Sequence, residues 1–321
     1  MSRVLGLDIG ATGTRARLVA DGVVISDATA SSASLTAVGP ERAAAAVDEL
    51  LAGLTGLDGP LDAVCAGAAG SQTARETGDL LRARLAPLTR SGDVLVVNDA
   101  LLVLPAAGLA EGVAVICGTG SIATGTWRGR EAWAGGWGYL LGVEGSGYWI
   151  VRAAIRALLG RDMSGLPLGD LGACLLGAAS APDLNTLRAE FFRRPQPGNW
   201  ARYAPAVLDC SDPGVAGLVR QAASDLAGLA AQVAGRLGAT GAPVALAGGL
   251  MAHGRLRAAT VAAIGAALPA SPVRLLSDPP VAGAVRLAEA VAARHFQPLR
   301  PPVPAGTATA DRRAGGGTRR C

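Results

Sequence analysis

The sequence contains no lysine, so all 29 of its Lys and Arg residues are arginine. A phosphate-binding loop of the G-x-x-x-x-G-K-[ST] type is therefore excluded, and so are mechanisms that use lysine as a base or as a Schiff-base nucleophile. A nucleotide site in this chain would have to use backbone N–H groups, hydroxyls and a metal ion.

Cysteine and histidine are also scarce. The five cysteines are scattered without C-x-x-C pairs, and the two histidines, His253 and His295, do not lie near them in the sequence. This pattern argues against a disulfide scaffold, a zinc site and simple iron–sulfur ligation, and for a reducing compartment. No run reaches the ~20 uncharged apolar residues that a membrane helix needs, and residues 1–20 are too charged for a signal peptide. We therefore expect a cytoplasmic protein with no membrane contact.

The net charge of +4 is confined to one end of the chain. Residues 298–321 hold five arginines and one aspartate, which account for the whole excess, so the body before them is neutral. The basic pI therefore gives no indication of a nucleic-acid surface. This segment is rich in Pro, Gly, Ala and Arg and has no apolar periodicity, so we expect a disordered tail.

Aromatic residues make up only 3% of the chain, whereas half of it is hydrophobic and rich in Ala and Gly. This composition is typical of a closely packed α/β protein, and 321 residues suggest two domains.

What the sequence does contain is a glycine- and threonine-rich hairpin pattern, written twice, at residues 5–18 and 113–125. Each copy is an apolar strand, a tight turn of small residues and a second strand. Glycines in such a turn leave backbone N–H groups free to face an anion, and short hydroxyls add donors. Two turns of this kind suit a polyphosphate held from both sides.

The remaining elements repeat around these two hairpins. The first half predicts strands at 4–10, 13–20, 22–28, 61–68 and 94–97, helices at 40–54 and 73–85, and a further helix opened by Asn98 and Asp99. The second half predicts strands at 113–117, 121–127 and 244–247, a Gly/Trp-rich loop at 133–149, and helices at 147–160, 168–179, 183–194, 214–238, 254–268 and 279–296. A duplicated pattern favours two similar halves with a crevice between them.

Five short motifs in this order carry a family resemblance. They are residues 8–15 (DIGATGTR), 98–100 (NDA), 118–121 (GTGS), 246–250 (LAGGL) and 281–285 (VAGAV). The chain resembles the BadF/BadG-type ATPase and N-acetylglucosamine kinase family of the actin, heat-shock ATPase and sugar kinase superfamily, including actinobacterial-type glucosamine kinases. The resemblance covers residues 3–296.

The resemblance implies an α/β fold with two ribonuclease H-like (actin-like ATPase) domains and a central interdomain cleft. The expected domains are 1–110 and 111–297, with the last helix, about 280–296, packed back on the first domain, and a disordered tail at 298–321. The implied cofactors are ATP and Mg²⁺, the implied substrate is a small sugar, and the implied assembly is a homodimer.

Under this resemblance, three motifs hold the nucleotide. The expected nucleotide-binding residues are Gly10, Thr12, Gly13, Thr14, Arg15, Gly118, Thr119, Gly120, Ser121, Gly248 and Gly249.

Two aspartates carry the expected chemistry. Asp8 ends a strand beside the first turn, where the family places a water-mediated contact to Mg²⁺; the alternative is an aspartate that caps the turn. Asp99 follows a buried strand, where a carboxylate could accept the proton of a sugar hydroxyl during phosphoryl transfer. The alternative for Asp99 is a helix N-cap.

The sugar site is expected around residues 133–149, which hold three of the five tryptophans. This segment resembles the amino-sugar kinase loop, Gly-Gly-Trp-Gly followed by Gly-Asp-Glu-Gly-Ser, with Val143 in place of the family's Asp. The loop at 31–36 lacks the Asn frequent in N-acetylglucosamine kinases. Because both departures touch the sugar pocket, we expect glucosamine to be favoured over N-acetylglucosamine. The expected substrate-binding residues are Asn98, Asp99, Thr119, Gly136, Trp137, Gly138, Glu144 and Ser146.

For Glu144 and Ser146 the alternatives are a solvent-exposed side chain and a helix cap, respectively. The sequence thus predicts an ATP-dependent kinase that phosphorylates the 6-hydroxyl of a hexosamine. The alternatives are an N-acetylglucosamine kinase and an activator ATPase of acyl-CoA reductases or dehydratases, whose dimer shares a cysteine-bound cluster. A sugar-sensing regulator would carry a DNA-binding helix-turn-helix, for which the hairpin near residue 1 leaves no room.

Overall fold

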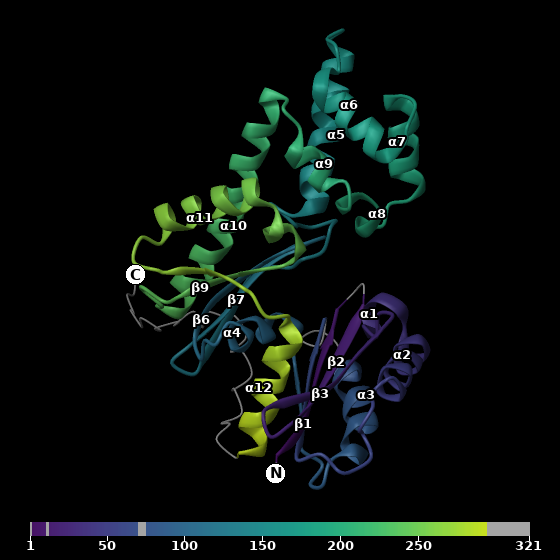
Figure 1. Cartoon of the computed structure of the whole chain (residues 1–321). Helices are drawn as coiled ribbons and strands as arrows, with labels where there is room; N and C mark the ends of the chain where they lie inside the picture. Colours follow the sequence, from purple (N-terminus) through teal and green to yellow (C-terminus); the bar gives the residue numbers. More distant parts are fainter. Residues whose placement is uncertain (1, 11–12, 70–74, 294–321) are drawn as a thin grey trace, which may run out of the picture.

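Two five-stranded sheets of the same topology form the centre of the molecule (Figure 1). The structure, a computed structural model, describes residues 2–10, 13–69 and 75–293. The first sheet has the order β3-β2-β1-β4-β5 and the second the order β10-β9-β6-β7-β8. In each sheet an antiparallel three-stranded meander is extended by two parallel strands. The mixed α/β fold with two sheets confirms the fold class expected from the sequence.

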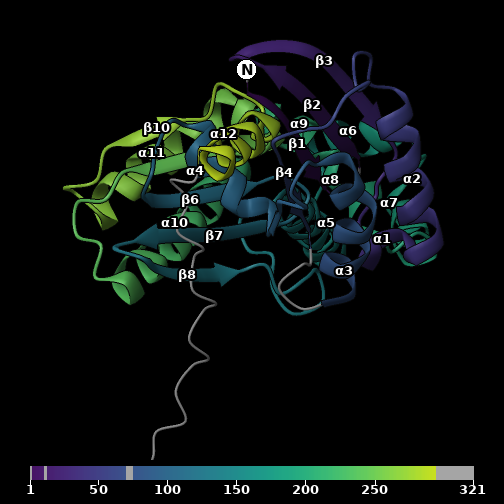
Figure 2. The ribbon, with the colours of Figure 1, turned by 90° about the horizontal axis from the view of Figure 1, so that it is seen from below.

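The strands of the first sheet are β1 (Arg3–Ile9), β2 (Thr14–Ala20), β3 (Val23–Ala30), β4 (Ala63–Ala68) and β5 (Val94–Val97). Those of the second sheet are β6 (Gly112–Cys117), β7 (Ser121–Trp127), β8 (Arg130–Gly135), β9 (Val244–Ala247) and β10 (Val273–Leu275). Figure 2 shows β6, β7 and β8 side by side. The strands at the middle of each sheet are continuous apolar runs because both of their faces are buried.

Helices cover both faces of the first sheet. On one face, α2 (Pro40–Ala52) and α3 (Arg75–Leu85) bury Leu50 and Leu85 in one apolar cluster with β1 and β4. On the other face lies α12 (Pro280–Ala292), whose Ala284, Val285 and Ala288 pack against strand residues such as Val4. The last described helix, α12, therefore packs on the first sheet.

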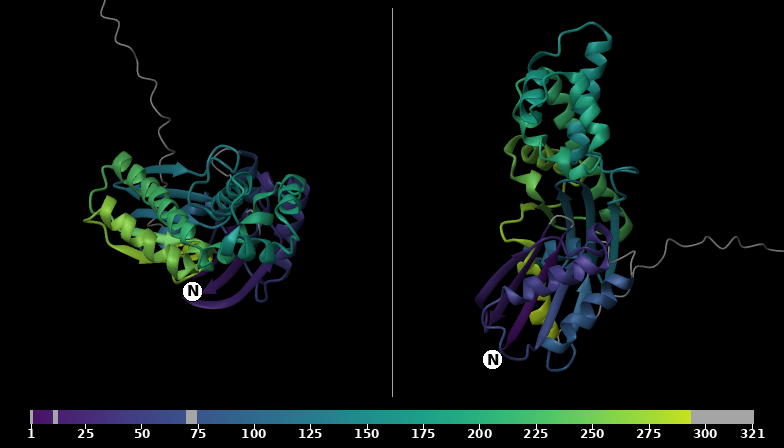
Figure 3. Two further views of the ribbon diagram at one scale, coloured as in Figure 1. Left: turned by 90° about the horizontal axis from the view of Figure 1, so that it is seen from above. Right: turned by 90° about the vertical axis from the view of Figure 1, so that its right-hand side faces the viewer.

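The second sheet is covered by α10 (Pro213–Leu237) and α11 (Gly254–Ala267). Its other face receives the short α4 (Val103–Ala106), whose Val103 and Leu104 contact Ala114 and Ala245. Between β8 and α10 the chain builds a helical lobe from α5 (Gly147–Met163), α6 (Gly169–Ala179), α7 (Leu184–Arg193), α8 (Pro197–Ala201) and α9 (Ala204–Asp209). This lobe lies at the end of the molecule opposite the N-terminus (Figure 3).

The segment between the sheets is held by unusually close backbone packing. The 3₁₀ turn η2 (Asp99–Leu102) leads into α4, and α12 crosses beside both. A Cβ at Gly283 would lie 2.0 Å from the Leu102 carbonyl oxygen, and one at Gly6 would lie 2.6 Å from the Val285 nitrogen. Only glycine permits these approaches, so α12 and η2 are fixed against each other and against β1.

One arginine of α12 links this helix to the end of α4. Arg286 of α12 donates to the carbonyl oxygens of Pro105 and Ala106, at 2.5 and 2.6 Å, and also to Asp278, at 3.0 Å. The carbonyls at the end of α4, which have no partner within that helix, are thereby satisfied.

The structure corrects several predicted elements. Residues 130–135 form strand β8, so the Gly/Trp-rich segment at 133–149 begins as an edge strand and only then becomes a loop. Strand β10, α1 (Leu35–Val38), η1 (Ala86–Leu88), η3 (Gly249–Ala252), α8 and α9 were not anticipated. The helix opened by Asn98 is a 3₁₀ turn followed by the four-residue α4.

The domain division at residues 110 and 111 stays a proposal. The expected tail at 298–321 lies outside the described residues, as does His295. Among the described helices, none combines the length and the apolar character that crossing a bilayer requires.

Candidate active site

The first hairpin turn, between β1 and β2, is closed by a backbone hydrogen bond from Gly10 N–H to the Gly13 carbonyl, at 3.0 Å. The Ser32 hydroxyl donates to the Gly10 carbonyl (2.9 Å), and the Ala33 N–H donates to the Thr14 hydroxyl oxygen (2.9 Å). The segment after β3 therefore braces this turn from outside. Thr14 is buried and orders the turn through this bond, while its direct contact with phosphate stays a prediction.

Thr12 and Arg15 are two further predicted nucleotide-binding residues of the first motif. Thr12 lies outside the described residues. Arg15 is exposed at the start of β2, directly opposite Asp8 in the strand register.

The second hairpin turn, between β6 and β7, is closed in the same way, from Gly118 N–H to the Gly120 carbonyl, at 2.9 Å. Its support is different. The N–H groups of Gly147 and Tyr148, in the first turn of α5, donate to the carbonyls of Gly118 (2.9 Å) and Thr119 (3.3 Å). The start of a helix therefore holds this turn, and two N–H groups that helix geometry leaves without partners are satisfied.

The third motif joins the second turn through one glycine. Gly248 follows β9 with φ +97°, and a Cβ there would lie 2.2 Å from the Cys117 carbonyl oxygen. Because Cys117 ends β6, the predicted adenosine motif and the second phosphate turn lie backbone against backbone. Gly249 is exposed at the start of η3.

The two predicted carboxylates come from neighbouring parallel strands of the first sheet. Asp8 lies near the end of β1, and Asp99 follows the end of β5, with β4 between them. Burial, and next the negative charge of Asp99, raise the pKa of Asp8 to about 6, against the opposing charge of Arg15. Burial also raises the pKa of Asp99. The two carboxylates are thus close enough to interact electrostatically, while their roles stay predictions.

Asp99 shares a backbone donor with its neighbour. The Ala100 N–H lies 3.1 Å from Asn98 Oδ1 and 3.0 Å from Asp99 Oδ1. Asn98 is the N-cap of η2, so capping does not depend on Asp99 alone. This leaves the second carboxylate oxygen of Asp99 available for chemistry.

The donor set around Asp8 fits Mg²⁺ bound to nucleotide phosphates. Hard cations prefer carboxylate oxygen, and Mg²⁺ keeps several waters when one or two carboxylates and substrate phosphates complete its shell. Within the described residues no group of three or more His, Cys, Asp or Glu gathers at one place. A water-rich Mg²⁺ held by a nucleotide, with Asp8 as its protein partner, is therefore the arrangement that these residues suit.

The loop after β8 presents the predicted sugar-binding residues. Gly136 and Gly138 take φ of +72° and +84°, which turn the chain on either side of Trp137, and 60% of the Trp137 surface is exposed. A Cβ at Gly142 would lie 3.0 Å from the Trp137 ring and 2.9 Å from Glu144 Oε2. The indole and the carboxylate therefore flank the same glycine, and Glu144 is exposed.

Two serines fasten this loop. Ser121 donates through its hydroxyl to the Glu144 carbonyl, at 2.7 Å, so the loop is tied to the second phosphate turn. Ser146 is fully buried and accepts from the Trp149 N–H, at 3.2 Å, as N-cap of α5. The cap alternative for Ser146 is thus observed, and its contact with a sugar stays a prediction.

The three tryptophans of this segment do not form one wall. Trp133 lies in β8, where its carbonyl accepts from Arg236 at 2.8 Å, and Trp149 packs against the core from α5. Only Trp137 belongs to the exposed loop. The tryptophan spacing in the sequence could not separate these roles because the extent of β8 was not predicted.

Two residues of this region escaped the sequence reasoning. Ser32 braces the first turn, and the hydroxyl-rich run at 31–34 was its only signal. Asp225, in α10, accepts from Gln221 at 2.8 Å; burial raises its pKa, and the charge of Glu144 adds to this rise. A lone acid within an alanine-rich helix was the signal for Asp225.

The side chain of His253 is paired with an aspartate in the structure. His253 precedes α11, and its Nε2 lies 2.8 Å from Asp209 Oδ1. This pairing joins the end of α9 to the start of α11.

Comparisons with known proteins agree with this geometry. The model of the BadF/BadG/BcrA/BcrD ATPase family matches residues 5–285. An N-acetylmuramic acid/N-acetylglucosamine kinase of Clostridium acetobutylicum is 35% identical over 167 residues. That match spans 50% of this chain and 54% of the relative, so about half of each protein is compared.

Solved structures extend the likeness to nearly the whole chain. A Chromobacterium violaceum protein assigned as an N-acetylglucosamine kinase is 27% identical, with a TM-score of 0.74, covering 90% of this chain and 99% of that one. A glucokinase of the ROK family from Streptomyces griseus, in complex with glucose and AMPPNP, is 20% identical, with a TM-score of 0.60, covering 90% and 98%. The second likeness concerns the fold alone.

Proposed function

Because the chain belongs to the BadF/BadG/BcrA/BcrD ATPase family, we propose that it is an ATP-dependent amino-sugar kinase that transfers the γ-phosphate to the 6-hydroxyl of a hexosamine. The observation that carries this proposal is the pair Asp8 and Asp99, both half-buried at the ends of strands of the first sheet, where the charge of Asp99 helps to raise the pKa of Asp8 beside the first of two closed glycine turns. Phosphoryl transfer needs in-line positioning, neutralisation of charge and a carboxylate that accepts the hydroxyl proton.

The proposed roles of the residues follow from their positions. The N–H groups of the two turns bind phosphate oxygens, as backbone nests do. Asp99 accepts the proton of the sugar hydroxyl as that oxygen bonds to phosphorus and the bond to ADP breaks. A pKa raised by burial makes Asp99 a stronger base than an exposed carboxylate. When bound, Mg²⁺ would supply charge neutralisation at the phosphates.

The proposed substrate is glucosamine in preference to N-acetylglucosamine. Glu144 is exposed beside Trp137, and the half-buried Asp225 lies within its electrostatic reach. Two carboxylates favour an ammonium group over an acetamide, which carries no charge. The buried Val143, in place of the family's aspartate, takes one polar group out of the loop.

N-acetylglucosamine is the second candidate substrate. The Clostridium acetobutylicum relative, matched over half its length, is named as a kinase of N-acetylmuramic acid and N-acetylglucosamine. Mg²⁺ as the metal, a homodimer and a cytoplasmic location complete the proposal; these three features rest on the family resemblance, and the location also on the cysteine pattern.

The deciding experiment is coupled ADP release with Mg²⁺-ATP against glucosamine, N-acetylglucosamine, glucose and N-acetylmannosamine. We expect strong turnover with one dominant hexosamine, and glucosamine above the rest. An ATP hydrolysis rate that is the same with and without each sugar would contradict the kinase proposal and favour the activator ATPase. The iron content of the protein would then be measured.

The substitution Glu144→Gln separates the two candidate substrates. It should lower kcat/KM for glucosamine about tenfold, since a hydrogen bond to a charged group contributes roughly 1.5–3 kcal/mol, and should change the value for N-acetylglucosamine much less. Equal losses with both sugars would remove Glu144 from amine recognition.

A further inference from the structure

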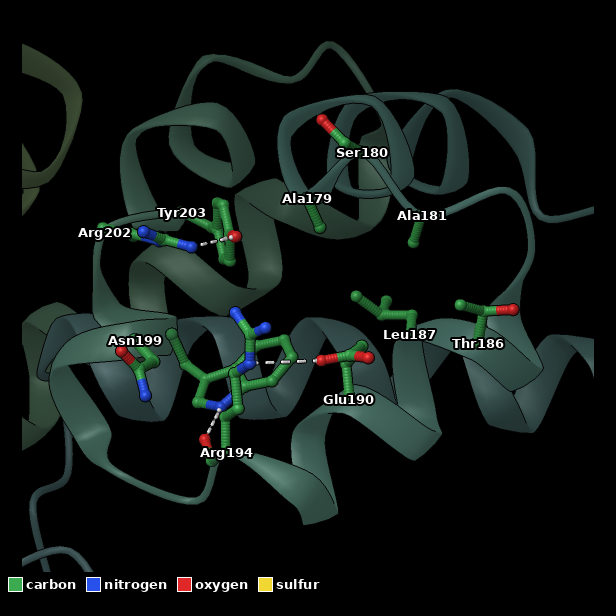
Figure 4. Close-up of a pocket in the computed structure, with 11 residues that line it drawn as sticks. Ala179, Ser180, Ala181, Thr186, Leu187, Glu190, Arg194, Asn199, Arg202 and Tyr203 are labelled. Atoms are coloured by element: carbon green, nitrogen blue, oxygen red, sulfur yellow. Dashed lines mark hydrogen bonds and ion pairs between the residues drawn. The ribbon is translucent and has the colours of Figure 1, made fainter.

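A second pocket lies in the helical lobe and shares no residue with the candidate active site. It is enclosed by the end of α6, by α7 and by the segment from Arg194 to Tyr203, which includes α8 (Figure 4). Its volume is about 260 Å³, close to the lower end of the roughly 300–1,000 Å³ found for small-molecule sites.

The pocket has an excess of positive charge. Arg194, Arg202 and Glu190 contribute its ionisable groups, and the Glu190 carboxylate is shared with Arg193, which does not line the pocket. Arg194 reaches Glu190 with its Nε, at 3.5 Å, so the terminal nitrogens of its guanidinium remain available to a ligand. Figure 4 shows Arg194 rising between Asn199 and Glu190 toward Tyr203.

The Arg202 guanidinium is held by Tyr203, and the backbone of Arg194 is held by Trp200. Arg202 lies over the Tyr203 ring, 4.8 Å from its centroid, and donates to the Tyr203 hydroxyl at 2.7 Å. The Arg194 carbonyl accepts from the indole N–H of the buried Trp200, at 2.6 Å, and Trp200 packs on Phe191 with 4.7 Å between ring centroids. A pre-oriented guanidinium group suits the bidentate binding of phosphate or carboxylate.

The rest of the wall suits a sugar ring. Leu187 with two alanines offers an apolar side, and Asn199, whose amide N–H donates to Gln196 at 3.1 Å, adds one short polar side chain. In Figure 4 the hydroxyls of Ser180 and Thr186 point away from the pocket. Few precisely placed polar groups on an apolar wall are typical of small-molecule sites.

From these observations we infer that the helical-lobe pocket is a second binding site, for a phosphorylated monosaccharide. The guanidinium groups of Arg194 and Arg202 hold the phosphate, and the opposite wall holds the ring. That this ligand is the product of the enzyme, a hexosamine 6-phosphate, rests on the proposed function; the anion chemistry of the pocket does not.

The pocket is close to the phosphate machinery. Ala201, which follows Trp200, packs on the first residue of α5, where a Cβ at Gly147 would lie 3.2 Å from the Ala201 Cβ. Gly147 in turn donates to Gly118 of the second phosphate turn. A ligand in the pocket thus contacts a segment that supports the nucleotide site.

The test counts bound glucosamine 6-phosphate by equilibrium dialysis and calorimetry on the full chain without nucleotide. The wild type is compared with Arg194→Ala/Arg202→Ala and with the control Arg188→Ala, an exposed arginine of α7 outside the pocket. We expect the wild type and the control to bind one more sugar phosphate per chain than the double variant, or to bind it at least tenfold more tightly at that site. This difference between the proteins is expected whether or not the catalytic cleft also binds glucosamine 6-phosphate. The test of the second site is therefore independent of the test of the kinase proposal.

Equal stoichiometry and affinity in all three proteins would overturn the inference. Inorganic phosphate and free glucosamine are titrated as further probes. If inorganic phosphate fills the site as tightly as the sugar phosphate, the pocket is an anion site and the sugar assignment is wrong. Near-ultraviolet circular dichroism and thermal unfolding of the double variant verify that its two exposed substitutions leave the lobe folded.

Discussion

The two hairpin turns are closed by the same backbone bond but are supported in different ways. The first, at Gly10, is braced by a serine hydroxyl and a backbone N–H from the segment after β3. The second, at Gly118, is braced by the start of α5 and is tied through Ser121 to the sugar loop. Under the proposed function the two halves differ in role: the first half holds the two carboxylates, and the second half links the predicted phosphate turn to the predicted sugar loop.

The largest effect is expected from the carboxylates of the first half. Asp99→Asn should lower kcat by about a thousandfold, since general-base catalysis contributes typically 10²–10⁴-fold, and should leave sugar binding nearly unchanged. Coupled ADP release gives kcat, and calorimetric titration with the sugar gives binding.

A kcat of Asp99→Asn within tenfold of the wild-type value would contradict the assignment of Asp99 as the general base. The loss of both sugar binding and kcat would indicate instead that Asp99 is needed for the structure of η2.

The first sheet also depends on a helix from the far end of the chain. Gly283→Ala would place a Cβ 2.0 Å from the Leu102 carbonyl, and overpacking of this kind costs typically 1–3 kcal/mol. We expect a free energy of unfolding about 3 kcal/mol lower, measured by urea denaturation.

The matched control is Gly228→Ala in α10, where a Cβ meets nothing within 4 Å. Alanine there should raise stability by about 0.5–1 kcal/mol because helical glycine loses more backbone entropy on folding. Equal effects of the two substitutions would contradict the close packing of α12 on η2.

The raised pKa of Asp8 predicts an unusual pH dependence for the metal-free protein. Because its pKa is about 6 in the folded state and 3.8 in the reference state, the folded state favours the protonated form. The contribution of Asp8 to stability is therefore full below pH 4 and is lost as the pH rises through 6. Asp8→Asn should gain about 3 kcal/mol at pH 7, since one pKa unit corresponds to about 1.4 kcal/mol, and much less at pH 4.

Thermal and urea unfolding at the two pH values measure this difference. An equal gain at both would show that Asp8 is not desolvated. In the presence of Mg²⁺-ATP the same variant should require a higher Mg²⁺ concentration for turnover, if Asp8 contacts the metal.

The smallest expected effects concern the two serine hydroxyls that support the hairpin turns, Ser32 at the first turn and Ser121 at the second. Ser121→Ala removes one side-chain hydrogen bond, worth about 1 kcal/mol. Ser32→Ala removes two, because the Ser32 hydroxyl also accepts from the Ser34 N–H at 3.2 Å, so both should lower stability, Ser32→Ala by more. Only Ser121→Ala should also raise KM for the sugar, because its bond reaches the Glu144 carbonyl. A sugar KM that rises equally in both variants would show that the turns do not differ in this way.

Much of the fold was predictable because its signals are local. The helix expected at 214–238 is observed at Pro213–Leu237, and the strands at 94–97 and 244–247 are observed as expected. Glycine-rich turns between apolar runs likewise predicted both hairpins.

The missed elements have weak local signals. Strand β8 begins with two adjacent charged residues, Arg130 and Glu131, and ends in Ala-Gly, and β10 is a three-residue edge strand with an exposed arginine. Both exist because a neighbouring strand offers hydrogen-bond partners, which no local pattern records.

The site shows the same limit. Asp8 and Asp99 could each be placed at the end of a strand from the apolar run before it. The bond from Ser32 to Gly10 and the approach of Asp225 to Glu144 depend on the length of β3 and on the rotation of α10. The pocket at Arg194 and Arg202 arises from three short helices whose packing the sequence pattern did not predict.

The packing of α12 on β1 also bears on how the protein is made. The strand is synthesised well before the helix that covers it, because β1 ends at Ile9 and α12 begins at Pro280. Translation adds about 5–20 residues per second. The face of the first sheet that carries Val4 and Cys65 therefore stays uncovered for on the order of 15–60 s, until α12 has been synthesised. During synthesis that apolar face is a natural target for a chaperone, and the first half completes its core only after the second half has been translated.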